Sequence, residues 1–197
     1  MVYTREELAA LYATCQKYNL RLFIDGARLG YGLVSAACDY DLPFLAKHCD
    51  VFYIGGTKVG AMMGEAVVFS GMKAPKYFFT NVKRHGALLA KGRMLGIQFD
   101  TLFTDELYFK ISRHAIAMAT RIRSIFEKHG IAIAYDSPTN QQFVVLSPAL
   151  YEALSQKVAF EIWERKSEHE IICRFVTSWA TKEEELDELD HILQAYA

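Results

Sequence analysis

Short apolar segments alternate with helical ones in the first part of the chain, and this alternation limits the fold more than any other feature. Three apolar segments are bounded by glycine, as strands often are: "RLFIDGA", "DVFYIGG" and "GEAVVFSG". Before the first of them, Thr4 can cap a helix through Glu7, and helical spacing of apolar residues continues to about Tyr18. A second apolar helix is expected near "LPFLAKHC". Strands separated by helices predict an α/β sheet.

A different pattern begins in the middle of the chain. From Gly86 to Gly130 the apolar residues keep a helical period with few breakers, which indicates long helices that leave the first domain. Strands are then expected at "IAIAY", "QQFVVLS" and "IICRFVTSW", and helices at "ALYEALSQ" and "TKEEELDELDHILQAY". The last helix should open at Thr181, with Glu184 completing its capping box. We expect a larger domain and a smaller α+β domain with these bounds: residues 1–115 and 116–197.

The composition bounds the class of protein. The chain has 197 residues, of which 52% are apolar and 13% aromatic, so it can build a substantial core. Lys and Arg number 22 and Asp and Glu 23, which leaves a formal charge of -1 and no basic excess for nucleic acid or an anionic membrane. Small molecules and copies of the same chain are therefore the expected partners.

Cysteine usage and the N-terminus indicate a cytoplasmic location. The four cysteines show no C-x-x-C spacing and lie within apolar segments, as buried reduced thiols do. The N-terminal segment resembles neither a signal peptide nor a membrane span, so we expect a protein that is neither exported nor membrane-embedded. The six histidines show no metal-ligand spacing, and no metal site is expected.

Polar residues follow two of the expected strands, in "FIDGAR" and "FYIGGTK". Ligands of open α/β sheets gather at the carboxyl ends of the strands, so Asp25 and Lys58 should line one crevice. The glycine-rich stretch from Gly55 to Gly64 is not a phosphate-binding Walker A loop, because its hydroxyl precedes the lysine and its glycine spacing differs. A lysine held among glycines is better suited to form a Schiff base.

The aspartate has a role beside such a lysine. The ring of pyridoxal phosphate withdraws electrons best when its nitrogen is protonated, and a neighbouring carboxylate keeps that proton in place. Lys58 for the Schiff base, Asp25 for the ring, and the Thr57 hydroxyl with glycine amides for the phosphate form a minimal set of groups for this cofactor.

The motif D-G-A-R-L at Asp25, followed by a [ST]-K-x-G stretch at Thr57, resembles the low-specificity threonine aldolases and related β-eliminating lyases. A further similarity is "CRFVTSWATKEEELDEL", where the family has an arginine before a short strand and a last helix. The resemblance covers essentially the whole chain. It implies the aspartate-aminotransferase architecture, fold type I of the enzymes that depend on pyridoxal 5'-phosphate.

The resemblance also implies residue roles. Lys58 would form the Schiff base, Asp25 would pair with the pyridine nitrogen, and Thr57 would bond the phosphate. Arg28 would lie over the phenolic oxygen of the cofactor and the substrate carboxylate, and Arg174 would complete a two-arginine clamp. The reaction implied is cleavage of the Cα–Cβ bond of a β-hydroxy-α-amino acid such as threonine or allo-threonine to glycine and an aldehyde.

Three departures from the family pattern bear on activity. The stretch "HGALLAKGRMLG" keeps Arg93 but has Met94 where the family has glutamine, and Thr57 stands where serine is common. The sequence also begins where the family is already partway through its large domain. The chain is therefore interpreted as the C-terminal part of an aldolase, with weak or no activity and with strand edges that favour association into a homo-oligomer, a dimer or a tetramer.

Two alternatives remain open. One is a β-eliminating amino acid lyase. The other, of a different class, is a non-catalytic truncated paralogue that only associates with itself or with a full-length relative.

Overall fold

The computed structural model describes residues 2–196, which form two compact units. The N-terminal unit extends from Val2 to Ile111, and the C-terminal unit from Ser112 onwards. The division falls within α6 (Leu107–Lys128), and so does the boundary expected near residue 115. Within the described residues, no helix combines the length and the apolar character that crossing a bilayer requires.

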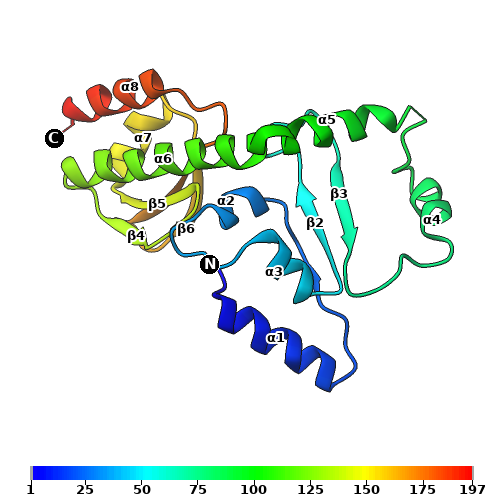
Figure 1. The fold of residues 1–197 in the computed structure, drawn as a ribbon. Coiled ribbons are helices and arrows are strands. Elements are labelled where there is room, and N and C mark those ends of the chain that lie inside the picture. Colours follow the sequence, from blue (N-terminus) through cyan, green and yellow to red (C-terminus); the bar gives the residue numbers. More distant parts are fainter. Residues whose placement is uncertain (1, 197) are drawn as a thin grey trace. The chain divides into compact units, whose positions relative to one another are not determined.

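The N-terminal unit contains a sheet of three strands in the order β1-β2-β3, at the positions expected from the sequence (Figure 1). Strand β1 pairs in parallel with β2, and β2 pairs antiparallel with β3. Strands β2 and β3 follow each other in the chain, so they form a hairpin whose loop lies at one end of the sheet. The strand bounds are β1 (Phe23–Ile24), β2 (Val51–Gly55) and β3 (Glu65–Phe69).

Five helices belong wholly to this unit. The first has the expected capping box, in which Thr4 and Glu7 bond to each other's backbone amide, and it ends at Lys17 with Tyr18 as its C-cap. Two helices, α2 and α4, were not expected, because each is short and lacks a repeated apolar period. The bounds are α1 (Arg5–Lys17), α2 (Leu29–Leu33), α3 (Leu42–Lys47), α4 (Phe78–Arg84) and α5 (Arg93–Phe103).

The long helical stretch is interrupted between α5 and α6 by a 3-10 turn (Thr104–Glu106). Asp105 and Glu106 have φ angles of 49° and 58°, in the left-handed region where a helix cannot continue. The Thr104 hydroxyl donates to the carbonyl of Asp100 at 2.8 Å and closes the end of α5. Three polar residues, Thr104, Asp105 and Glu106, separate the apolar residues of the two helices at this break.

The C-terminal unit is built on an antiparallel sheet in the order β4-β5-β7-β6. Strand β6 was not expected, since all five of its residues are exposed and it has no buried face to produce an apolar period. The prediction that Thr181 caps the last helix was wrong: α8 begins at Glu183 after Lys182, whose amide donates to Glu185. The bounds are β4 (Ile133–Tyr135), β5 (Gln141–Leu146), α7 (Pro148–Ser155), β6 (Glu161–Arg165), β7 (Ile171–Val176) and α8 (Glu183–Gln194).

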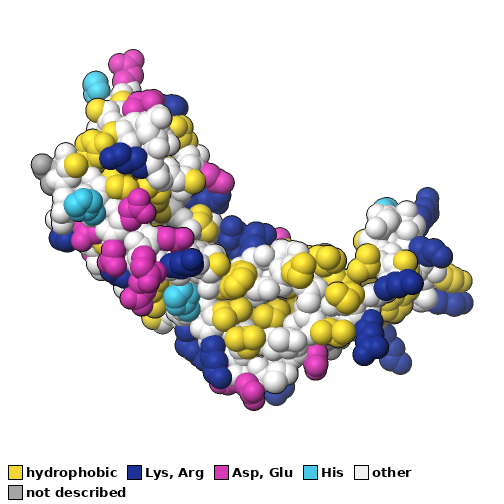
Figure 2. All heavy atoms as spheres, turned by 90° about the horizontal axis from the view of Figure 1, so that it is seen from above, with side chains coloured by type: hydrophobic (Ala, Val, Ile, Leu, Met, Phe, Trp, Pro, Cys, Tyr) yellow, Lys and Arg dark blue, Asp and Glu magenta, His cyan; other side chains and the backbone are white. Residues whose placement is uncertain are grey.

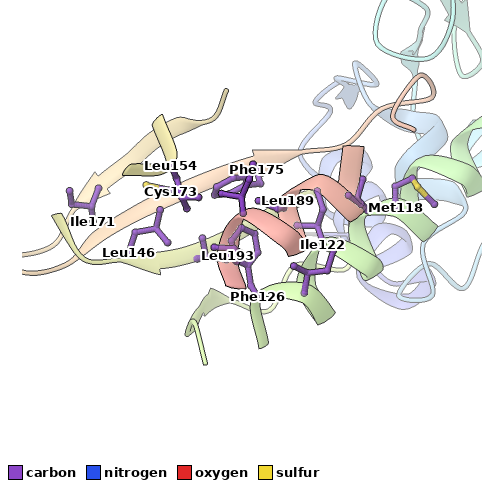
Figure 3. Close-up of a cluster of buried hydrophobic side chains, with 14 residues drawn as sticks. Met118, Ile122, Phe126, Leu146, Leu154, Ile171, Cys173, Phe175, Leu189 and Leu193 are labelled. Carbon is purple, nitrogen blue, oxygen red and sulfur yellow. The ribbon is translucent and has the colours of Figure 1, made fainter. Parts of the chain in front are cut away.

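One face of this sheet carries the core of the C-terminal unit (Figure 3). Alternate residues of β5 and β7 point into it, among them Val144 and Leu146 from one strand and Cys173 and Phe175 from the other. Helices α6, α7 and α8 add Met118, Phe126, Leu154, Leu189 and Leu193. Arg174 lies between Cys173 and Phe175 in β7 and so is on the opposite face, which it shares with the buried Ile172.

Candidate active site

The ends of β1 and β2 approach each other so closely that only glycine fits. The Gly55 amide donates to the Gly26 carbonyl at 2.9 Å. A Cβ on Gly26 would lie 1.7 Å from the carbonyl oxygen of Tyr53, and one on Gly55 would lie 2.3 Å from that of Ala27. This backbone contact brings the Asp25 turn and the Lys58 loop to the same edge of the sheet.

Asp25 follows β1 directly and accepts two hydrogen bonds on one oxygen. The Tyr53 hydroxyl and the Ala27 amide, the latter at 3.0 Å, both donate to its Oδ1. The bond from Tyr53 is the main reason that the pKa of Asp25 lies below its usual value, and the Ala27 amide and the charge of Lys58 act in the same direction. The carboxyl is therefore ionised at neutral pH.

Lys58 is presented by a loop whose backbone is fixed. The amides of Val59 and Ala61 both donate to the carbonyl of Gly56, at 2.9 and 3.0 Å, and the buried Tyr31 donates its hydroxyl proton to the Lys58 carbonyl. The Lys58 side chain itself is exposed, and its ammonium makes no hydrogen bond or ion pair within residues 2–196. The structure thus fixes the main chain of Lys58 and leaves its amine available.

Tyr108 was not identified from the sequence, although it connects the turns around the site. Its buried hydroxyl accepts the Gly30 amide at 3.1 Å and donates to the Gly55 carbonyl at 3.0 Å. Burial raises the pKa of this phenol, which keeps the proton that the second bond needs. Tyr108 therefore holds the first turn of α2 against the end of β2.

Glu65, the first residue of β3, was also missed. It pairs with Gly55 across the hairpin, and its carboxylate accepts the Gly56 amide at 2.6 Å and the Thr57 hydroxyl at 3.1 Å. A hydroxyl has only one proton to donate. The predicted contact of Thr57 with a phosphate therefore requires the hydroxyl to leave Glu65.

This arrangement gives a stability prediction for Glu65. Glu65→Ala is expected to lower the free energy of unfolding of the N-terminal unit by about 1–2 kcal/mol, because an amide and a hydroxyl lose an ionised acceptor. Chemical denaturation measures the change. Glu168→Ala, at an exposed position in the C-terminal unit, is the control and should change stability by less than about 0.5 kcal/mol. Equal effects of the two substitutions would contradict a structural role for Glu65.

Arg28 lies three residues after Asp25, at the N-cap of α2. It is half-buried, and within the described residues its guanidinium takes part in no hydrogen bond or ion pair. A half-buried arginine with free donors is suited to bind an anion, because its planar fork matches a carboxylate.

Arg174 lies in the C-terminal unit with its guanidinium already engaged. One nitrogen donates to Gln141 Oε1 at 2.9 Å, another pairs with Glu161, and the group lies over the Trp163 ring at 5.3 Å. Its Nε is buried without a hydrogen-bond partner. The predicted clamp of Arg28 and Arg174 joins residues of different units and stays a prediction.

Polar contacts with α5 hold the loop that follows Lys58, and the N-terminal unit exposes several large apolar side chains. Gln98 accepts the Met62 amide at 2.7 Å and donates to the Met63 carbonyl at 3.4 Å. Figure 2 shows hydrophobic side chains gathered on the surface in the middle of the view. Large exposed apolar residues of this unit include Met62, Met63, Met94 and Ile97.

Among the described residues, no group of three or more metal-ligating side chains occurs.

Known proteins are similar to this chain in sequence and in fold. Low specificity L-threonine aldolase of Pseudomonas sp. (strain NCIMB 10558) is 30% identical over 189 residues, which are 95% of this chain and 54% of the relative. The threonine aldolase of Leishmania major has a TM-score of 0.94 and 36% identity, with 98% of this chain and 57% of that chain covered. The chain thus spans about half the length of these relatives.

More distant structures agree in fold alone. SPT with its PLP internal aldimine is 14% identical with a TM-score of 0.64, over 94% of this chain and 49% of that chain. The architecture is thus that of fold type I enzymes dependent on pyridoxal phosphate, as expected from the sequence. A family model described as "Beta-eliminating lyase" matches residues 1–149. Residues 1–149 form most of the chain, and the protein belongs to the beta-eliminating lyase family.

Proposed function

We propose that this chain carries the lysine and the ring-nitrogen partner of a lyase of the threonine aldolase type that depends on pyridoxal 5'-phosphate. The observation that carries the proposal is the juxtaposition of the free amine of Lys58 and the ionised carboxylate of Asp25 at one edge of the sheet. Its substrates would be β-hydroxy-α-amino acids such as threonine or allo-threonine, in line with the named activity of the relatives.

The residues of the N-terminal unit fit the cofactor in two of three respects. Lys58 has an uncommitted amine, and Asp25 has one oxygen, Oδ2, that receives no hydrogen bond within residues 2–196. Thr57 fits only after its hydroxyl exchanges Glu65 for a phosphate oxygen. When bound, pyridoxal phosphate supplies a sink for the electrons of the bond that breaks.

The chain's own residues then have distinct tasks. Lys58 would give up a proton so that its neutral amine could condense with the cofactor's carbonyl group and release water, and Asp25 would hold a proton on the ring nitrogen. Arg28 would bind the substrate carboxylate, and the family resemblance implies the same task for Arg174, whose guanidinium would first have to leave Glu161. Fixing the carboxylate orients the Cα–Cβ bond for cleavage.

The proposal extends to organisation and location. Residues 1–115 would be the remainder of the cofactor-binding large domain with its connecting helix, and residues 116–197 the small C-terminal domain. The exposed apolar residues of the N-terminal unit favour a homo-oligomer, a dimer or a tetramer. The four cysteines are free thiols, which favours the cytoplasm.

The test is to supply the purified chain with pyridoxal phosphate and measure both the visible absorbance band and the products. Acetaldehyde and glycine from threonine or allo-threonine would support the aldolase. Pyruvate or ammonia from serine or tyrosine would instead support the β-elimination that the description of the family names. If the chain shows neither band nor product, it does not act as the proposed lyase, and association measured by light scattering would then favour the non-catalytic paralogue.

A further inference from the structure

We propose that Tyr53 is a positioning residue that holds one oxygen of Asp25 so that the other faces the pyridine nitrogen. The inference rests on the proposed function, in which Asp25 is the partner of that nitrogen. It adds a residue that the sequence motif around Asp25 does not contain.

The register of the sheet places the two side chains together. Strands β1 and β2 are parallel, with Ile24 level with Phe52, so the next residues of each, Asp25 and Tyr53, come level as β1 ends. On the other side of β2, Tyr53 pairs with Val67. The Phe23 ring lies against the Tyr53 ring, with centroids 6.1 Å apart. The phenol is thus flanked by apolar groups, and its hydroxyl is directed at Asp25.

The hydrogen bonds at Asp25 are unequally shared between its two oxygens. Oδ1 accepts both the Tyr53 hydroxyl and the Ala27 amide, whereas Oδ2 accepts no bond from the described residues. An exposed carboxylate that lacks such bonds rotates freely, and it loses rotational entropy when it binds a ligand. Two donors on one oxygen fix the carboxylate plane in advance and leave Oδ2 as its one open acceptor.

The bond also controls the charge of both groups. It lowers the pKa of Asp25 and raises the pKa of Tyr53 to about 12, so at neutral pH the carboxyl is ionised and the phenol keeps its proton. Glu65 adds to the rise of the Tyr53 pKa, and Lys58 adds to the fall of the Asp25 pKa. With the charges of Glu65 and Lys58 present, Tyr53 remains the donor and Asp25 the acceptor.

Tyr53→Phe tests the proposal, because it removes the hydroxyl and keeps the ring packing. We expect about three- to tenfold weaker binding of pyridoxal phosphate, the size of one lost hydrogen bond. Tyr77→Phe, at an exposed tyrosine of the same unit, is the matched control and should bind like the wild type. In an Asp25→Asn background the substitution of Tyr53 should have no further effect on affinity. An equal loss with and without Asp25 would show a merely structural role and overturn the proposal.

Carbon-13 NMR of the Asp25 carboxyl, recorded without cofactor, separates this proposal from the proposed function. In Tyr53→Phe the pKa of Asp25 should rise towards its ordinary value, and in Tyr77→Phe it should not. An unchanged Asp25 titration in Tyr53→Phe overturns the pairing whatever the cofactor does. If the titration moves but no variant binds pyridoxal phosphate, the pairing stands and the ring-nitrogen role of Asp25 is overturned.

Discussion

Lys58→Ala is expected to abolish the visible absorbance band with pyridoxal phosphate and any lyase activity that the chain has, because the covalent catalytic group is lost. The fold should not change. The Lys58 side chain is exposed, while the contacts that fix its loop, including the hydrogen bond from Tyr31, involve only the main chain at this position. Absorbance spectroscopy, borohydride reduction and peptide mapping measure the effect.

Lys73→Ala supplies the control for this experiment. Lys73 is an exposed lysine of the same unit, and its removal should leave the band, the activity and the unfolding free energy unchanged within about 0.5 kcal/mol. A band that persists in Lys58→Ala would show that the cofactor is attached elsewhere, and an equal loss in Lys73→Ala would show that the loss is not specific to Lys58.

Gly26→Ala is expected to destabilise the N-terminal unit by about 3 kcal/mol or more, which is large for a single methyl group. The added Cβ would lie 1.7 Å from the Tyr53 carbonyl oxygen, so the two backbones must separate. Separation breaks the bond from the Gly55 amide to the Gly26 carbonyl. Amide hydrogen exchange in β2 should speed up accordingly, while exchange in β5 of the C-terminal unit serves as the internal reference.

The matched substitution is Gly32→Ala in α2. A Cβ there meets no atom within 4 Å, and alanine is about 1 kcal/mol more favourable than glycine inside a helix. This variant should be as stable as the wild type or slightly more stable. Similar stabilities of the two alanine variants would mean that the Gly26–Gly55 contact does not hold the strand ends together.

The sequence predicted the parts of this fold that have an apolar period or a local motif. The three strands of the N-terminal sheet and the Thr4 capping box both follow from short segments of chain, whereas the roles of Asp25 and Lys58 stay predictions. Strand β6 was missed because an edge strand with both faces exposed leaves no pattern. The family resemblance, in turn, was confirmed by the match to the beta-eliminating lyases.

The supporting residues of the site could not be predicted because their partners are distant in the sequence. Tyr108 bonds to groups 78 and 53 positions away, and Tyr53 reaches Asp25 from 28 positions away. Glu65 is closer to Gly56, but its role depends on the strand register that closes the hairpin. The sequence signal for Tyr53 is an aromatic residue two positions before Gly55. Tyrosines that only pack in the core give the same signal.

The contact between Gly26 and Gly55 has a consequence for directed evolution of this chain. Because no side chain fits at either position, main-chain contacts fix the spacing between the Asp25 turn and the Lys58 loop, and substitutions at other positions keep the atoms that make these contacts. Libraries aimed at new substrates should therefore leave both glycines unchanged. Substitution of neighbouring side chains such as Arg28 would leave this main-chain contact in place.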